Sequence, residues 1–346
     1  MNSSTFSSEV DVAALWRRWL VILLTTLVTS SVAAFAAVVM LDPYSTGRLT
    51  PIQRVDIAIP TRTFVVAGLA RDARFNAAVL GNSHGMSIEP EILNAATGAR
   101  FVQLWVYGQL PPDTMFLLDV FDRRHRPQKP TLVVVLDLTW CDAERGRSLH
   151  TELPRWLYEG SDLDYLRKLP SPLAVIGALR RVLIFAGLAA PAGRADGFVP
   201  NFWTPGNRVV FRREMEGIQR PTDDPIMGEP YPYMEDLAGH LAKLDPDSRV
   251  VLVLAPAYID ALPVPGSAAE AKVDGCKDRV REIARLRPST RFVDLQVDGP
   301  LARDSRNFID ARHVDGKGVE ELNAAVAHTL RELMGETASS TSALPR

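Results

Sequence analysis

An uncharged apolar run near the N-terminus constrains this chain more than any other feature of its sequence. Residues 19–41 read WLVILLTTLVTSSVAAFAAVVML, which is 23 consecutive positions without a charged side chain. A helix rises about 1.5 Å per residue, so a helix of this length crosses a hydrocarbon core of about 30 Å. We therefore expect one transmembrane helix over residues 19–41.

The charges that flank this run predict its orientation. Arg17 and Arg18 come directly before it, and the first charge after it is Asp42. Because basic flanks stay in the cytoplasm, residues 1–18 are expected there and the rest of the chain on the far side, in the periplasm. The prediction is a single-pass protein of the cell inner membrane. A cleaved signal peptide is the alternative, although hydrophobic regions of signal peptides usually span only about 7–15 residues.

A second apolar stretch, over residues 173–190, is not expected to cross the membrane. Arg180 and Arg181 lie near its middle, and charged side chains are costly within lipid. We expect a helix that packs on the domain or lies on the membrane surface.

Beyond the anchor, short runs rich in Val and Leu alternate with helical patterns. This alternation predicts an α/β domain over residues 77–335, with a parallel sheet covered by helices on both faces. The strands are expected at residues 77–80, 101–107, 131–138, 249–255 and 291–295. The helices are expected at residues 89–96, 113–123, 234–243, 270–286 and 318–334.

Three segments do not fit this alternation. Residues 42–76 are rich in Pro and Gly at their start and are expected to form a linker or an irregular entry segment. Residues 142–232 contain many prolines and aromatic side chains, and we expect an insertion folded over one end of the sheet. Residues 336–346 are expected to be a disordered tail.

The first expected strand ends in Gly81-Asn82-Ser83-His84-Gly85. Open α/β sheets carry their reactive groups at the carboxyl ends of strands, so Ser83 is a candidate nucleophile. Backbone N–H groups at the start of the next helix could stabilise an oxyanion there. The alternative is that Ser83 only caps that helix. We expect His84 to pack or hydrogen-bond locally.

A second motif, Asp310-Ala311-Arg312-His313, comes just before the last expected helix. A carboxylate three residues before an imidazole can orient it, which would supply a general base and its partner from one loop. The alternative for an isolated motif of this kind is an exposed polar loop.

Together, these motifs resemble the SGNH (GDSL-type) hydrolase superfamily. The resemblance rests on Gly81-Asn82-Ser83, on Gly108 after the second strand and on the Asp310–His313 motif, and it extends over residues 77–334. It implies a three-layer, flavodoxin-like fold. It also implies Ser83 as nucleophile, His313 as general base, Asp310 as its partner, and an oxyanion hole made by the N–H groups of Ser83 and Gly108.

One element departs from this superfamily, which has G-x-N-D after its third strand with an Asn side chain in the oxyanion hole. Here the corresponding segment is Leu136-Asp137-Leu138-Thr139, without Asn. An ionised Asp137 would repel an oxyanion. Either another donor such as the Thr139 hydroxyl takes this place, or the protein is a slow or inactive relative.

The overall plan, an anchor followed by an SGNH-like domain outside the cytoplasm, resembles accessory proteins of cell-envelope polysaccharide O-acetylation. That resemblance implies a membrane-bound acyltransferase and a polysaccharide as partners. One hypothesis is therefore an esterase or O-acyltransferase acting on an ester or an acylated envelope saccharide. The alternative is an inactive domain that binds envelope polysaccharide or scaffolds a membrane acyltransferase.

The remaining residue types limit other functions. The 39 Lys and Arg against 41 Asp and Glu give a net charge of −2, which argues against nucleic-acid binding. The six histidines have no ligand-like spacing and no phosphate-binding loop follows a strand, so neither a metal nor another cofactor is expected. Cys141 and Cys276 are the only cysteines and are candidates for a disulfide in an oxidising compartment. Two buried thiols are the alternative.

Overall fold

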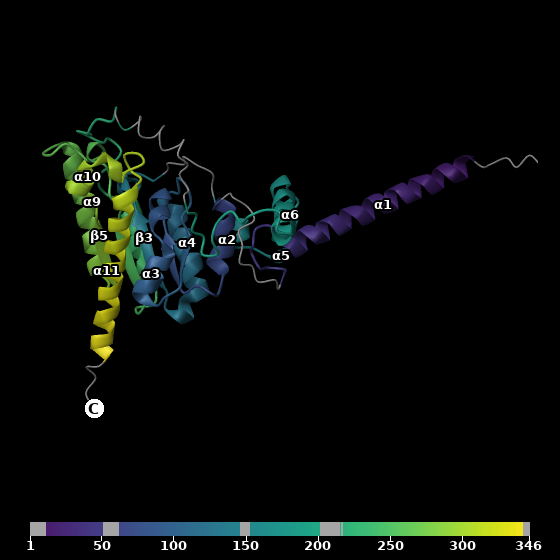
Figure 1. Ribbon diagram of the computed structural model, residues 1–346, viewed down its shortest axis with the longest axis horizontal. Helices are drawn as coiled ribbons and strands as arrows, with labels where there is room; N and C mark the ends of the chain where they lie inside the picture. Colours follow the sequence, from purple (N-terminus) through teal and green to yellow (C-terminus); the bar gives the residue numbers. More distant parts are fainter. Residues whose placement is uncertain (1–11, 51–61, 146–152, 201–214, 216, 342–346) are drawn as a thin grey trace, which may run out of the picture.

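The domain is built on a five-stranded parallel sheet in the order β2-β1-β3-β4-β5 (Figure 1). The computed structural model describes residues 12–50, 62–145, 153–200, 215 and 217–341. The strands are β1 (Ala77–Leu80), β2 (Phe101–Gln103), β3 (Thr131–Leu136), β4 (Arg249–Leu254) and β5 (Thr290–Asp294). The predicted α/β class is confirmed, and so is each of the five predicted strands. Only β2 is clearly shorter than expected, although its chain continues beside β1, where the Leu104 N–H donates to the Val79 carbonyl.

The strands consist of apolar residues because both faces of the sheet are covered. Along β3, Leu132 and Val134 contribute to one hydrophobic core, whereas Val133 and Val135 contribute to another. In β4, which pairs with β3 in register, Leu252 lies opposite Val134 and belongs to the same core. The sheet therefore separates two apolar layers.

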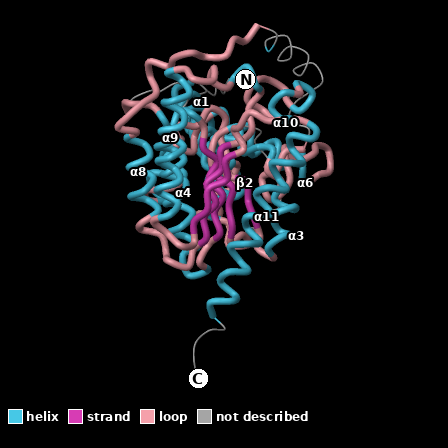
Figure 2. Tube along the Cα trace, turned by 90° about the vertical axis from the view of Figure 1, so that its left-hand side faces the viewer, coloured by secondary structure: helices cyan, strands magenta, loops and turns pink. Residues whose placement is uncertain are grey.

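Helices cover both faces of the sheet, giving three layers (Figure 2). One face is covered by α3 (Pro90–Thr97) and α11 (Gly316–Thr341). The other face is covered by α2 (Arg62–Arg71), α4 (Pro111–His125), α8 (Pro232–Leu241) and α9 (Ala268–Arg285). The remaining helices are η1 (Ser83–Ser87), η2 (Arg126–Gln128), η3 (Leu138–Cys141), η4 (Arg155–Leu157), α5 (Asp162–Lys168), α6 (Pro172–Phe185), η5 (Ile259–Ala261), α10 (Pro300–Arg303) and η6 (Ser305–Asn307).

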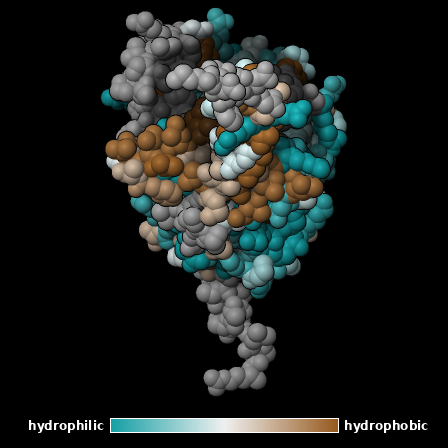
Figure 3. Space-filling model, turned by 90° about the vertical axis from the view of Figure 1, so that its right-hand side faces the viewer, coloured by the Kyte–Doolittle hydropathy of each residue, from teal (hydrophilic) through white to brown (hydrophobic). Residues whose placement is uncertain are grey.

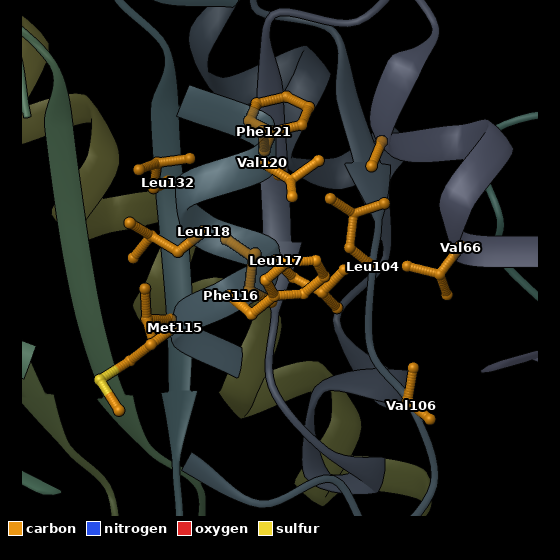
Figure 4. Close-up of a cluster of buried hydrophobic side chains, with 14 of the residues drawn as sticks. Val66, Leu104, Val106, Met115, Phe116, Leu117, Leu118, Val120, Phe121 and Leu132 are labelled. Carbon is orange, nitrogen blue, oxygen red and sulfur yellow. The ribbon is translucent and has the colours of Figure 1, made fainter. Parts of the chain in front are cut away.

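The larger core lies between α4 and the sheet (Figure 4). Leu117 and Phe121 of α4 are fully buried there, together with Leu104 and with Leu132 of β3. Burying a side chain of this size stabilises the fold by about 1.5–3 kcal/mol. This packing fixes β1 and β3, whose carboxyl ends carry the candidate site.

Helix α1 (Val12–Leu41) extends away from the domain (Figure 1). It contains no buried residue, and among the described residues it is the one helix long and apolar enough to cross a membrane. It begins seven residues before the uncharged run, so Arg17 and Arg18 lie on the helix itself. The expectation of one apolar N-terminal helix is confirmed.

The segment predicted as a linker or irregular entry segment, residues 42–76, is packed into the folded domain over its described residues and contains α2. Asp42 and Tyr44 are buried, and α2 buries Val66, Ala67 and Ala70 completely. Composition was misleading here because Gly47, at φ 65°, forms a local turn that the Asp42 side chain stabilises. The domain therefore begins at Asp42, although residues 51–61 lie outside the described part of the chain.

The predicted insertion and tail differ from expectation in part. Within residues 142–232, α5 and α6 lie beside the domain end of α1 (Figure 1). Met227 pairs instead with Asp142, just beyond the carboxyl end of β3, as expected for a segment folded over one end of the sheet. Residues 146–152, 201–214 and 216 lie outside the described residues. Helix α11 continues to Thr341, so the tail predicted to be disordered is helical as far as that residue.

Candidate active site

Ser83 lies at the carboxyl end of β1, where the chain turns sharply into η1. Gly81 makes this turn possible, because its φ is 135° and a Cβ there would lie 2.6 Å from the Val135 carbonyl oxygen. The side chain that caps η1 belongs to Asn82, whose Oδ1 accepts the His84 N–H at 3.1 Å. The capping role considered for Ser83 is therefore taken by its neighbour, and the Ser83 hydroxyl remains available for another contact.

Asp310 and His313 lie on a tight loop just before α11. The Ile309 N–H donates to the His313 carbonyl at 2.8 Å and closes the loop. Asp310 Oδ1 accepts the N–H groups of Arg312 at 2.7 Å and of His313 at 2.8 Å. Asp310 Oδ2 lies 2.6 Å from His313 Nδ1. The carboxylate thus fixes both the loop and the imidazole.

The sheet brings this loop to Ser83, although the two are 230 residues apart in sequence. His313 Nε2 lies 2.8 Å from Ser83 Oγ. Asn323 of α11 supports this approach, because its Nδ2 donates to the Ser87 carbonyl and its Oδ1 accepts the Glu89 N–H, each at 2.8 Å. Ser83, His313 and Asp310, the three residues predicted as a catalytic unit, form one hydrogen-bonded chain.

The electrostatics keep Asp310 ionised. Burial alone would raise the pKa of its carboxyl group, but the hydrogen bond and charge of His313, together with the two backbone N–H groups, hold that pKa below its usual value. An ionised carboxylate on Nδ1 selects the imidazole tautomer that offers Nε2 as an acceptor to the Ser83 hydroxyl.

His84 lies edge-on to His313, with 5.1 Å between the ring centres. Burial, and then the nearby charges of His313 and Arg312, lower the pKa of His84 to about 3. Its ring is therefore neutral across the physiological pH range, and it is not placed between Ser83 and His313.

The loop after β2 runs beside the Ser83 turn. The Val106 N–H donates to the Gly81 carbonyl at 3.1 Å, and two residues later Gly108 turns the chain at φ 61°. Among the described residues, no acceptor contacts the backbone N–H of Ser83 or of Gly108. Both groups predicted for the oxyanion hole are thus unpaired donors on adjacent loops.

Thr139, the third predicted donor, is engaged elsewhere. Its hydroxyl and its N–H both donate to Asp137 Oδ1, at 2.5 and 3.0 Å. Asn82 Nδ2 donates to the other oxygen of Asp137. Burial raises the pKa of the Asp137 carboxyl, and this outweighs the hydrogen bonds and the Arg312 charge, which lower it. The structure therefore does not place the Thr139 hydroxyl with the unpaired donors.

Sequence reasoning missed the contact between Asn82 and Asp137. The two residues are 55 positions apart, and neither belongs to the predicted triad. The signal in the sequence was an amide beside the candidate nucleophile and a carboxylate in the segment after β3. The pairing of β1 with β3 brings these two side chains together beyond the carboxyl ends of the strands.

Cys141 and Cys276 form a disulfide, with their Cα atoms 5.6 Å apart. It links η3, directly after the Asp137 segment, to α9 across 135 residues of sequence. No group of three or more His, Cys, Asp or Glu side chains in the described part of the chain is arranged to hold a metal ion.

Comparison with models of known protein families gives no match, and comparison with curated protein sequences gives none either. The arguments about function therefore rest on the geometry of the site.

Proposed function

We propose that this protein is a membrane-anchored serine esterase or O-acyltransferase of the SGNH type. The observation that carries the proposal is the hydrogen-bonded chain from Ser83 Oγ through His313 to Asp310. A buried serine with an imidazole at 2.8 Å, itself oriented by a carboxylate, is the arrangement that activates a hydroxyl for attack on an acyl group.

The strand order supports the same proposal. The order β2-β1-β3-β4-β5 is that of flavodoxin-like sheets, which bind ligands beyond the carboxyl ends of β1 and β3. Ser83 follows β1, Asp137 follows β3, and the Asp310–His313 loop enters α11. These are the positions at which the resemblance to SGNH hydrolases places the reactive groups.

The reaction would proceed through an acyl-Ser83 intermediate. Ser83 Oγ bonds to the acyl carbon while its proton passes to His313 Nε2, and Asp310 stabilises the resulting imidazolium. The ester C–O bond then breaks, and the leaving oxygen takes that proton from His313. Water or a sugar hydroxyl next attacks the acyl carbon, gives its proton to His313 and releases Ser83.

The oxyanion would be stabilised by the unpaired N–H groups of Ser83 and Gly108, with Asn82 as the side-chain donor. An amide nitrogen carries two hydrogens, and the bond to Asp137 uses one of them. Asp137 then serves as the acceptor that orients Asn82, which accounts for a carboxylate beside a site that must stabilise negative charge.

The substrate we propose is an ester or an acylated saccharide of the cell envelope, with a membrane-bound acyltransferase and a polysaccharide as partners. This follows from the resemblance in plan to polysaccharide O-acetylation proteins and from the orientation that Arg17 and Arg18 favour. A reporter active only outside the cytoplasm, fused after Arg62, is expected to be active. Activity of a cytoplasmic reporter at that junction would contradict the periplasmic, inner-membrane placement.

Covalent labelling with a fluorophosphonate probe tests the catalytic proposal. The wild-type protein should be labelled, Ser83→Ala should not, and Ser87→Ala should be labelled like the wild type because Ser87 is at the other end of η1. Labelling that persists in Ser83→Ala contradicts the assignment of the nucleophile.

A second candidate is a non-catalytic domain that binds envelope polysaccharide or scaffolds an acyltransferase. The observation in its favour is Asp137, a half-buried carboxylate after β3, with the Thr139 hydroxyl donating to it. Failure of the folded wild-type protein to react with the probe, combined with binding of polysaccharide, would favour this candidate.

A further inference from the structure

Helix α6 has an unpartnered apolar face. Its buried side contains Ala174, Gly177, Ala178 and Arg181, which recur at helical spacing. The opposite side is apolar and exposed, with individual side chains between 36% and 61% accessible. The residues of this exposed side, which we term the α6 apolar face, are Val175, Ile176, Leu179, Val182 and Leu183.

Of the two charged residues of α6, Arg181 is enclosed by the domain and Arg180 borders the α6 apolar face. Arg181 is fully buried, and its Nη2 donates to Ser45 Oγ at 2.5 Å. Arg180 Nη2 reaches the Ala190 carbonyl at 3.4 Å, beyond the end of the helix. The first turn of α6 has no acidic residue and the last turn has no basic residue. Apart from the partly exposed Arg180, the exposed side of α6 is therefore apolar.

Helix α1 joins the domain without a flexible spacer, directly beside α6. Val38 and Val39 of α1 pack against the larger core, and Asp42 accepts the N–H groups of Thr46 at 3.0 Å and Gly47 at 2.8 Å. Helices α1 and α6 are in contact. Since the uncharged run ends at Leu41, one residue before this turn, α6 is held at the level where a membrane-spanning α1 leaves the lipid.

The orientation of α6 fits that position. It runs across the axis of α1 at the domain end of α1 (Figure 1), so it would lie along the surface of a bilayer that α1 crosses. Apolar side chains gather on the side of the molecule from which α1 projects (Figure 3). Interfacial helices of this kind place an apolar face about 5–10 Å into the boundary between headgroups and acyl chains.

We propose that α6 is an interfacial helix whose apolar face inserts into the lipid surface on the domain side of the membrane. The occupant is lipid rather than a soluble protein, because a bilayer around α1 already covers the space that this face confronts. The α6 apolar face and α1 would then hold the domain in a fixed orientation on the membrane. This inference depends on α1 spanning the bilayer and not on the proposed catalytic activity.

Depth-dependent fluorescence quenching of the full chain tests this inference. Both native cysteines are in the disulfide, so a single introduced cysteine is the only free thiol among the described residues. Variants Ile176→Cys and Leu179→Cys would carry an environment-sensitive fluorophore in vesicles of phosphatidylethanolamine and phosphatidylglycerol with brominated acyl chains. Leu286→Cys, at an exposed leucine after α9, is the matched control, and Leu27→Cys reports on α1.

We expect the labels at Ile176 and Leu179 to be quenched several-fold more strongly than the label at Leu286, with Leu27 also quenched. Equal quenching at Ile176, Leu179 and Leu286, with Leu27 quenched, would overturn the inference while leaving the anchor in place. An unquenched label at Leu27 would show that α1 does not cross the bilayer, and would overturn the premise on which the inference depends. Labels on α6 that are shielded from both lipid and aqueous iodide, and become exposed on dilution of the protein, would assign the face to a second copy of the chain and also overturn it.

Discussion

The carboxyl edge of the sheet and the base of α1 use polar side chains in opposite ways. At the edge, Ser83, His313 and Asp310 contact one another at a point open enough to leave His313 partly accessible. At the base of α1, Asp42 and Arg181 are buried beneath the α6 apolar face. The polar side chains at the carboxyl ends of the strands are therefore partly accessible, whereas those at the domain end of α1 are covered by apolar side chains.

This contrast follows from what each region contacts. A group that reacts with a substrate needs donors and acceptors at a surface, in an arrangement fixed before the substrate arrives. A surface that rests on lipid needs its polar groups satisfied internally, because a bilayer offers no hydrogen-bond partners. The chain meets both requirements because the candidate active site and the domain end of α1 have no side chain in common.

Disrupting the triad should have the largest effect and should leave the base of α1 intact. Ser83→Ala and His313→Ala should each lower the rate of ester turnover by about 10⁴-fold or more, and the double variant should lose little beyond that. Turnover of an activated ester, measured beside far-ultraviolet circular dichroism, checks this. Independent, additive losses would mean that the residues do not act as one catalytic unit.

Removing the disulfide should destabilise the edge of the sheet. Replacing Cys141 and Cys276 together by Ser should lower the free energy of unfolding by about 4 kcal/mol, because the bridge closes a loop of more than 100 residues in the unfolded chain. Urea denaturation of the full chain in detergent measures this. An unchanged transition midpoint would show that the disulfide does not contribute to the free energy of unfolding.

Much of the edge was predictable because its motifs are local. Gly81 to Ser83 and Asp310 to His313 each lie within a few residues, and buried parallel strands have a recognisable pattern. The sequence could not show that Asn82 donates to Asp137, since that contact depends on the pairing of β1 with β3. A sequence motif specifies residue types and their spacing, whereas a tertiary contact depends on which strands become neighbours in the fold.

The base of α1 was less predictable for the same reason. Residues 42–76 have the composition of a linker, yet Asp42 forms an internal hydrogen-bond centre with Thr46, Gly47 and Tyr165. Tyr165 comes from α5, 123 positions away. Helix α2 lacks a clear polar face because the domain encloses most of it. Its burial depends on partners that composition does not reveal.

Replacing the buried Arg181 tests the region at the domain end of α1. Arg181→Met keeps the length of the side chain but removes the bond to Ser45, and should lower the free energy of unfolding by about 2–3 kcal/mol. Arg180→Met is the matched control and should change it by less than about 0.5 kcal/mol. Both variants should react with the fluorophosphonate probe at the wild-type rate. Slower labelling of Arg181→Met would mean that the two regions are coupled.

His84 should produce the smallest effect, as a pH dependence confined to the carboxyl edge. Its folded pKa, about 3, lies below the value of about 6.5 expected in the unfolded chain. As the pH falls from about 6.5 toward 3, the unfolded chain binds a proton that the folded protein does not, so stability decreases over that interval. Because the His84 ring is only partly buried, we expect the free energy of unfolding to decrease by about 1 kcal/mol between about pH 6.5 and pH 4.

Urea denaturation across this range should show that His84→Gln loses less stability on acidification than the wild type. His328→Gln, at an exposed ring on α11, is the control and should follow the wild type. An acid response identical in His84→Gln and the wild type would show that the environment of His84 does not disfavour its charged form.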